Sequence, residues 1–312
     1  MKKILLTGGA GYIGSVLTPL LLQKGFEVTV IDNFMYKQPS LASVTFHRNL
    51  NIVYGDVRDY TIMKTLISKA DVVIPLAAIV GAPACHKDPE GSSSINKDSI
   101  IWLLNSLSSN QQIIMPTTNS AYGSGNEDNY CDENSKLTPL SLYAKDKVIV
   151  ESELLQKSNA TSFRLATVFG ISPRMRLDLL VNNFVYRALT DKHLALSEGH
   201  FKRNYVHLRD VCQVFLYAIE NPEKVEGQVF NFGLSSANIS KEELCQEIKL
   251  QLPDFTYTNV PFQKDPDQRN YIVSNKKIEN LGAGASISIS EGIKELIKGL
   301  GMFVSYPYTN LQ

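Results

Sequence analysis

The segment LTGGAGYIG at positions 6–14 decides the fold that this sequence predicts. It ends a short apolar run, Lys3–Thr7, and the residues that follow have the length and composition of a helix. Glycine lets a chain turn sharply after a strand and leaves room for a pyrophosphate, because it has no Cβ. A helix that begins there offers free N–H groups and a positive dipole end to phosphates. The segment therefore predicts a strand–turn–helix unit that binds a dinucleotide.

Strands and helices continue to alternate through the first half of the chain. Short runs rich in apolar residues lie at 3–7, 28–32, 51–54, 71–77, 112–117 and 162–169. Segments long enough for helices lie between them, at 12–24, 60–68, 92–107 and 143–155. Strands that are apolar on both faces are typical of buried parallel sheets, and strand–helix–strand repeats form right-handed crossovers. We expect an α/β fold of the Rossmann type, with a doubly wound parallel sheet.

The pattern changes after about residue 169, where segments rich in Pro, Arg and Asn separate short elements. We predict a dinucleotide-binding domain at 1–169, to which residues 204–232 return. Residues 170–203 and 233–312 are expected to form a smaller α+β lobe that binds the substrate.

The composition narrows the classes of function. Of the 312 residues, 44% are hydrophobic and 20% charged, as in ordinary water-soluble proteins. Lys plus Arg equals Asp plus Glu at 31 each, so a nucleic-acid partner, which favours a basic surplus, is not expected. No run approaches the roughly 18 apolar residues of a spanning helix, and the N-terminal apolar run is too short for a secretory signal. We expect a cytoplasmic protein with no membrane partner.

Four cysteines are scattered along the chain, with no His at metal-ligand spacing. They are expected to be reduced thiols, and no metal site is predicted.

An acidic residue at the end of the second expected strand specifies the dinucleotide. Asp32 stands 18 residues after Gly14, close to the spacing at which a carboxylate accepts hydrogen bonds from the adenine ribose. It would repel a 2′-phosphate, so NAD is favoured over NADP, although Lys37 nearby could serve a phosphate. Other candidates lie where strands end, and Asp56 there could bind the adenine amino group or simply cap a helix. The predicted cofactor-binding residues are Gly8, Gly11, Tyr12, Ile13, Gly14, Asp32, Asn33, Asp56, Val57, Leu76, Ala77, Ala78, Tyr143 and Lys147.

Three further residues predict acid–base chemistry. Tyr143 and Lys147 are four apart, so they share one face of a helix. A tyrosine has a pKa of about 10, and a nearby ammonium group favours its phenolate, which can then accept a proton from a sugar hydroxyl. Thr118 ends the fifth expected strand, where its hydroxyl could bridge the substrate and Tyr143.

These residues, in this order, resemble the extended short-chain dehydrogenase/reductase family of NAD-dependent nucleotide-sugar epimerases and dehydratases. Thr118 lies four residues before the Tyr of a Tyr-Gly pair, Tyr122-Gly123, and 25 before Tyr143, as in that family. The matching motifs cover roughly half of the chain. The resemblance implies an NAD enzyme that acts on a nucleotide-diphosphate sugar, with Thr118, Tyr143 and Lys147 as catalytic residues.

The resemblance also implies substrate contacts in the second lobe. The segment RNYVHLRDV at 203–211 is similar to one in the family, and His207 within it is expected to be structural. Arginine binds phosphate oxygens with a planar, permanently charged fork. Arg203 and Arg269 would hold the nucleotide diphosphate, and Asn182 would donate to a phosphate. The full predicted set of substrate-binding residues is Thr118, Thr167, Arg174, Arg176, Asn182, Arg203 and Arg269.

Three departures from the family pattern narrow the reaction. Asn119 and Ser120 stand where 4,6-dehydratases have Asp-Glu, and neither can shuttle the required protons, so dehydration is disfavoured. Ser120 also replaces the glutamate of related decarboxylases. Thr167 replaces the family's usual Asn, which puts the substrate contacts near it in doubt.

Thr118, Tyr143 and Lys147 still favour oxidation at C4 of the sugar. It leads to a 4-epimer if hydride returns to the other face, or to a released 4-ketone. Residues 163–178 are similar to bacterial GDP-heptose 4-dehydrogenases, so a role in surface-polysaccharide precursor synthesis is implied. A non-catalytic NAD-binding regulator on the same fold is the alternative, although such proteins commonly lose the Tyr or the Lys.

A homodimer is expected from the family, through the helices at 92–107 and 143–155. Its apolar contacts could come from Trp102, Leu103, Leu104, Val148, Val150 and Leu154, although some of these must cover the sheet.

Overall fold

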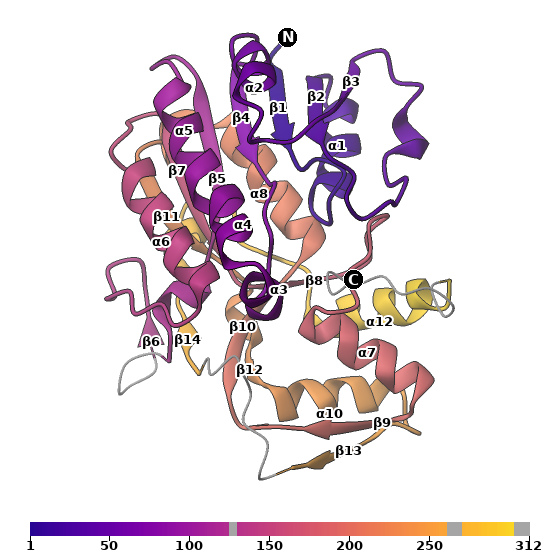
Figure 1. The fold of residues 1–312 in the computed structure, drawn as a ribbon. Coiled ribbons are helices and arrows are strands. Elements are labelled where there is room, and N and C mark those ends of the chain that lie inside the picture. The colour runs from indigo at the N-terminus through magenta and orange to yellow at the C-terminus, as the bar shows by residue number, and fades with distance from the viewer. Residues whose placement is uncertain (125–129, 261–269, 303–312) are drawn as a thin grey trace.

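A seven-stranded parallel sheet forms the centre of the larger lobe (Figure 1). The computed structural model describes residues 1–124, 130–260 and 270–302. The strand order is β11-β7-β5-β4-β1-β2-β3, and every neighbouring pair is parallel. The strands are β1 (Lys3–Thr7), β2 (Glu27–Asp32), β3 (Leu50–Tyr54), β4 (Val72–Pro75), β5 (Gln112–Thr118), β7 (Ala160–Leu165) and β11 (Gln228–Phe232). This order confirms the expected Rossmann-type fold.

Helices cover both faces of the sheet, because side chains that alternate along its strands enter two separate cores. Leu6 of β1 packs into a core shared with α1 (Gly14–Gln23) and α8 (Leu208–Glu220). Leu5, its neighbour, packs into a second core with α2 (Tyr60–Ile67), α5 (Ser99–Ser106) and α6 (Leu142–Leu154). The sheet is therefore doubly wound.

The apolar run at 162–169, predicted as one strand, is divided between two sheets. β7 ends at Leu165, and the N–H of Ala166 donates to the carbonyl of Phe232 over 2.9 Å. The chain then forms β8 (Thr167–Phe169), which pairs in parallel with β10 (Lys202–His207). β12 (Asn238–Ser240) completes this three-stranded sheet on the other side of β10. It links the large lobe to the second one.

The second lobe lies below the sheet in Figure 1 and contains helices beside a short strand pair. β9 (His193–Leu196) and β13 (Thr256–Asn259) pair in parallel. The helices are α7 (Leu180–Thr190), α10 (Lys241–Gln251) and α12 (Ile289–Leu300). Short elements elsewhere are the parallel pair β6 (Tyr130–Cys131) and β14 (Ile272–Val273), and the helices α9 (Pro222–Val225) and α11 (Lys276–Glu279).

The helix expected at 92–107 is longer and less regular than predicted. It follows α3 (Ala82–Lys87) and begins as α4 (Pro89–Ser93), where the side chain of Asp88 accepts a hydrogen bond from the N–H of Gly91. A π-helical segment, Ser94–Asp98, connects α4 to α5. Such segments are often found at functional sites.

Within the described ranges, no helix is both long enough and apolar enough to cross a bilayer. No group of three or more His, Cys, Asp or Glu side chains in the same ranges is arranged to hold a metal ion.

Candidate active site

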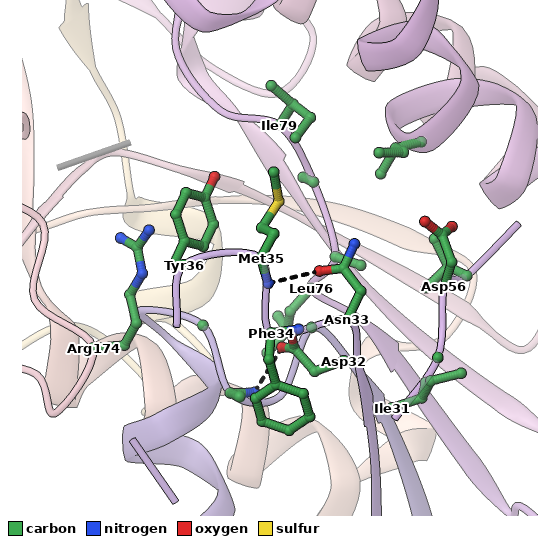
Figure 2. A pocket seen from close by; sticks show the side chains of 18 of the residues that line it. Ile31, Asp32, Asn33, Phe34, Met35, Tyr36, Asp56, Leu76, Ile79 and Arg174 are labelled. Atoms are coloured by element: carbon green, nitrogen blue, oxygen red, sulfur yellow. Dashed lines mark hydrogen bonds between the residues drawn. The ribbon is translucent and has the colours of Figure 1, made fainter. Parts of the chain in front are cut away.

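A cavity opens at the carboxyl ends of β1, β2 and β4 (Figure 2). Ligands bind at this edge of open α/β sheets. Nine residues predicted to bind the cofactor line it, namely Gly8, Gly11, Asp32, Asn33, Asp56, Val57, Leu76, Ala77 and Ala78. The loop after β2 adds lining residues that were not predicted, among them Tyr36, and Ile79 and Ile95 add apolar surface.

Gly8 shows why the first turn needs glycine. Its φ is +67°, and a Cβ there would lie 2.6 Å from the nitrogen of Ala77. No other residue fits without moving the loop after β4. The glycine-rich turn can therefore pack directly against a second wall of the cavity.

The carboxylate of Asp32 organises the loops around it. One oxygen accepts from the N–H of Ala10 over 3.0 Å, and the other accepts from the N–H of Phe34 over 2.8 Å. Burial raises the pKa of Asp32, and these hydrogen bonds oppose that rise. Each carboxylate oxygen has a second lone pair, so both can still accept from a ribose hydroxyl.

Asp56 is held by a neighbouring guanidinium group. Arg58 donates to both of its oxygens, over 2.9 and 2.7 Å, and this lowers the pKa of Asp56. Beside it, the side-chain oxygen of Asn33 accepts from the N–H of Met35 over 3.1 Å. Both side chains face the cavity (Figure 2).

Asn96, in the π-helical segment, fixes the loop after β4. Its amide oxygen accepts from the N–H of Ile79, and its amide nitrogen donates to the carbonyl of Ile79, each over 2.9 Å. Sequence reasoning missed this residue, because a lone Asn within a helical pattern carries no signal for such a contact.

The other five residues predicted to bind the cofactor do not line the cavity, namely Tyr12, Ile13, Gly14, Tyr143 and Lys147. The hydroxyl of Tyr12 is buried and donates to the carbonyl of Gly170 over 2.7 Å, and its burial raises the pKa. Its side chain joins the two lobes, so only the backbone here remains available to a phosphate.

The three predicted catalytic residues lie on neighbouring elements at the same edge of the sheet. Tyr143 and Lys147 share one face of α6, with the ammonium nitrogen 5.9 Å from the centre of the ring. Thr118 ends β5, and the 3₁₀ turn that follows it, Asn119–Tyr122, packs against α6. The Thr118 hydroxyl oxygen accepts from the N–H of Ser120 over 3.1 Å and donates to that residue's hydroxyl over 3.0 Å.

Lys147 is buried, with 3% of its surface exposed. Burial lowers its pKa to about 8, although Asp146 and Cys85 both act in the opposite direction. The group therefore still carries its charge at neutral pH, but loses it more easily than a surface lysine does.

Glu151 continues the same helical face and was not predicted. Its carboxylate is buried and accepts from the Arg164 guanidinium over 2.6 Å. It also accepts from Thr117 of β5 over 2.9 Å and from Ser162 of β7 over 2.7 Å. One side chain thus ties the helix of Tyr143 and Lys147 to the strand that ends at Thr118. Its spacing, four residues after Lys147, was the signal available.

Asn182 was expected to face a phosphate of the substrate, but it lies inside the protein. It is fully buried, and its two amide hydrogens donate to the Tyr12 hydroxyl over 3.1 Å and to the carbonyl of Arg176 over 3.0 Å. No donor remains for a phosphate, which corrects the role predicted for this side chain.

The predicted arginines occupy different surroundings. Arg176 pairs with Asp178, with one nitrogen–oxygen distance of 2.5 Å, and Arg203 is buried in β10. Arg174 lines the cavity with the residues predicted to bind the cofactor, so it does not lie apart from them as its place in the sequence suggested. Arg269 lies outside the described residues.

Two side chains, one after β5 and one at the start of β8, have buried polar atoms without hydrogen bonds. Neither the Thr167 hydroxyl nor the amide of Asn119 has a hydrogen-bond partner among the residues described. Leaving such a group unsatisfied costs about 1–3 kcal/mol. A ligand that bonded to them would remove this cost.

Comparison with known proteins identifies a family. The family model described as "NAD dependent epimerase/dehydratase family" matches residues 4–233. The sequence is 28% identical to the UDP-N-acetyl-alpha-D-glucosaminuronate decarboxylase of Bacillus cytotoxicus, over 95% of this chain and 97% of that protein. It is 27% identical to the CDP-paratose 2-epimerase of Salmonella typhi, over 94% and 98% respectively.

A solved structure shares the fold. The UDP-glucuronic acid 4-epimerase of Bacillus cereus, in complex with UDP-glucuronic acid and NAD, superposes with a TM-score of 0.84. The match covers 96% of this chain and 99% of that one at 23% identity, so it speaks for the fold alone.

Proposed function

The chain belongs to the NAD-dependent epimerase/dehydratase family, and we propose that it oxidises C4 of a nucleotide-activated sugar. The observation that supports the proposal is that Tyr143 and Lys147 share one face of α6, and that this helix packs against the turn that follows Thr118. The cavity suits NAD, because Gly8 keeps a Cβ out of the turn and Asp32 keeps two lone pairs for a ribose. NAD, when bound, accepts the hydride that leaves the sugar carbon.

In the proposed reaction, the Tyr143 phenolate accepts the proton of the C4 hydroxyl. The O–H bond breaks, a C=O bond forms, and the C4–H bond releases its electron pair as hydride. In the substrate complex the Thr118 hydroxyl donates to the same sugar oxygen in place of the Ser120 hydroxyl, and keeps that oxygen near the phenol. The Lys147 ammonium favours the charged form of the phenol.

We propose Thr118, Thr167, Arg176, Arg203 and Arg269 as substrate contacts, and add Asn119. The unsatisfied polar atoms of Thr167 and Asn119 support a role in binding sugar hydroxyls. The arginines would bind the nucleotide diphosphate through charge-assisted hydrogen bonds.

Dehydration and decarboxylation are disfavoured on residue chemistry, although relatives of both kinds are similar to this chain. An amide at Asn119 and a hydroxyl at Ser120 do not exchange protons near neutral pH as carboxylic acids do. The retained Tyr143 and Lys147 argue against a purely regulatory protein.

The product decides between epimerisation and net 4-dehydrogenation. Purified protein is incubated with UDP-glucose and, separately, with GDP-heptose, and the products are resolved by NMR. A 4-epimer with no net NADH identifies an epimerase, whereas a 4-keto sugar with an equal amount of NADH identifies a dehydrogenase. A 4,6-dehydrated product, or no turnover of any nucleotide sugar offered, would contradict the proposal.

We also propose a homodimer formed through α5 and α6. Four of the apolar residues considered for this interface, Leu103, Leu104, Val150 and Leu154, instead cover the sheet. Trp102 stacks on Tyr60, with ring centres 4.3 Å apart. Ile149, which was not among the residues considered, is 44% exposed on α6, and we propose it as an apolar contact of the dimer.

A further inference from the structure

Arg174 comes from the second half of the chain but reaches the cavity at the end of β2. Its residue is 2% exposed, and it is one of two cationic side chains in the cavity lining, with Lys37 as the other. Lys37 is exposed, whereas Arg174 is enclosed by protein. A cation held in a site that already contains Asp32 needs an explanation.

Tyr36 supports the guanidinium group. The central carbon of the Arg174 guanidinium lies 3.7 Å from the centre of the Tyr36 ring, a close cation–π contact. Figure 2 shows the two side chains next to each other on one flank of the cavity, with Asp56 on the opposite flank and Asp32 between. If the adenine is at Asp56 and its ribose at Asp32, the cofactor continues toward Arg174.

The loop that carries Tyr36 is strained on both sides of it. Phe34 has φ +51° and Lys37 has φ +52°, in the region that non-glycine residues seldom adopt. Strain of this kind persists where the surroundings impose it, and it is concentrated at ligand sites. Here it presents the Tyr36 ring to Arg174.

The backbone before Arg174 is fastened to the glycine-rich turn. The Ser172 hydroxyl donates to the carbonyl of Tyr12 over 2.8 Å and lies 2.9 Å from the hydroxyl of Ser15. It also accepts from the N–H of Arg174 over 3.2 Å. The backbone at Arg174 is thus held near the start of α1, where free N–H groups and the helix dipole attract phosphate.

We propose that Arg174, seated on the Tyr36 ring, binds the diphosphate of NAD and retains the cofactor. This inference rests on the proposed function, which supplies the cofactor. It assigns Arg174 to the dinucleotide in place of the nucleotide sugar. The planar fork of arginine suits two phosphate oxygens, and the aromatic ring holds the fork in place before the ligand arrives.

Binding titrations without turnover test the inference. The dissociation constants of NAD, ADP-ribose and adenosine are measured for the wild type, Arg174→Gln and Arg174→Lys. We expect Arg174→Gln to weaken NAD and ADP-ribose about 10- to 100-fold, in line with the loss of a charge-assisted hydrogen bond, and to leave adenosine unchanged. Arg174→Lys should lose less affinity for NAD and ADP-ribose, because lysine keeps the positive charge. Arg48→Gln, at an exposed arginine that does not line the cavity, is the matched control and should change none of the three.

The outcomes distinguish binding of the NAD diphosphate from binding of the nucleotide-sugar diphosphate. They also distinguish failure of this inference from failure of the proposed function. Unchanged NAD affinity in Arg174→Gln, with a raised KM for the nucleotide sugar, would return Arg174 to the substrate and overturn the inference. An equal loss of adenosine in Arg174→Gln, Arg174→Lys and Tyr36→Leu would show a packing role and overturn it too. If the wild type binds no NAD, the proposed function itself fails. If the wild type binds NAD and Arg174→Gln binds it equally tightly, only this inference fails.

Discussion

At the scale of single residues, burying the charged Lys147 side chain lowers the free energy of unfolding. Its folded pKa of about 8 lies below its ordinary value of 10.5, so the unfolded chain binds the proton more tightly. Stability from this group is therefore present above about pH 10.5 and is lost as the pH falls through 8. The protein retains a destabilising charge because, in the proposed reaction, the ammonium favours the phenolate of Tyr143.

Lys147→Met should accordingly stabilise the NAD-free protein while abolishing activity. At pH 7 we expect a gain on the order of 3 kcal/mol in the free energy of unfolding, from a pKa difference of 2.5 units between about 8 and 10.5. The gain should shrink between pH 8 and 10.5, where the wild type sheds the proton. Urea unfolding at pH 7 and 10 measures it, with Lys145→Met, exposed on the same helix, as control. A Met variant less stable than the wild type at pH 7 would contradict the assigned cost.

The sequence predicted many individual residues of the site, because short spacings set them. A spacing of four residues places Tyr143 and Lys147 on one helical face. Asp32 and Asp56 lie at the cavity because each stands where a strand ends. It did not predict that Arg174 meets Tyr36. They are far apart in the chain, and only the tertiary fold brings them together.

At the scale of elements, Glu151 sets the position of α6 against β5 and β7. The Glu151–Arg164 pair is buried, and Thr117 and Ser162 use the remaining capacity of the carboxylate. Removing one partner of a buried ion pair costs about 3–5 kcal/mol, since the other charge stays buried.

Glu151→Gln should therefore destabilise the protein by about 3 kcal/mol or more in urea unfolding. Glu153→Gln, two residues along and exposed, should change stability by less than about 0.5 kcal/mol. Equal stability of the two variants would show that the ion pair does not hold the helix.

Element boundaries were less predictable than element types. The run at 162–169 is apolar throughout, so nothing in it marks the point after Leu165 where the chain leaves one sheet for another. The break is imposed by Phe232 and β10, which lie some 40 to 70 residues further along the chain. The π-helical segment likewise reflects a tertiary contact, between Asn96 and Ile79.

At the scale of the whole molecule, the sheet order brings β1, β2, β4 and β5 side by side. The end of β5, where Thr118 lies, is therefore next to β4, one of the strands at whose ends the cavity opens. Strand–helix alternation was sufficient to predict this class of fold, because parallel strands require crossovers.

The proposed dimer gives a prediction at the same scale. Ile149→Glu should convert a dimer to a monomer at micromolar concentration, because it would bury an unpaired charge at the interface. Light scattering measures the mass, and Lys249→Gln, exposed on α10 in the second lobe, is the control. A wild-type protein that is monomeric under these conditions would overturn the dimer.

The central claim, proton removal by Tyr143 coupled to hydride loss from the sugar, is tested most directly by absorbance at 340 nm. NAD-loaded wild type and Tyr143→Phe are mixed with a panel of nucleotide sugars, and NADH formation is followed through a single turnover. We predict that at least one sugar produces NADH in the wild type, and that Tyr143→Phe slows this by about 10²–10⁴-fold while binding NAD normally. NADH formation at the same rate in both proteins would contradict the account.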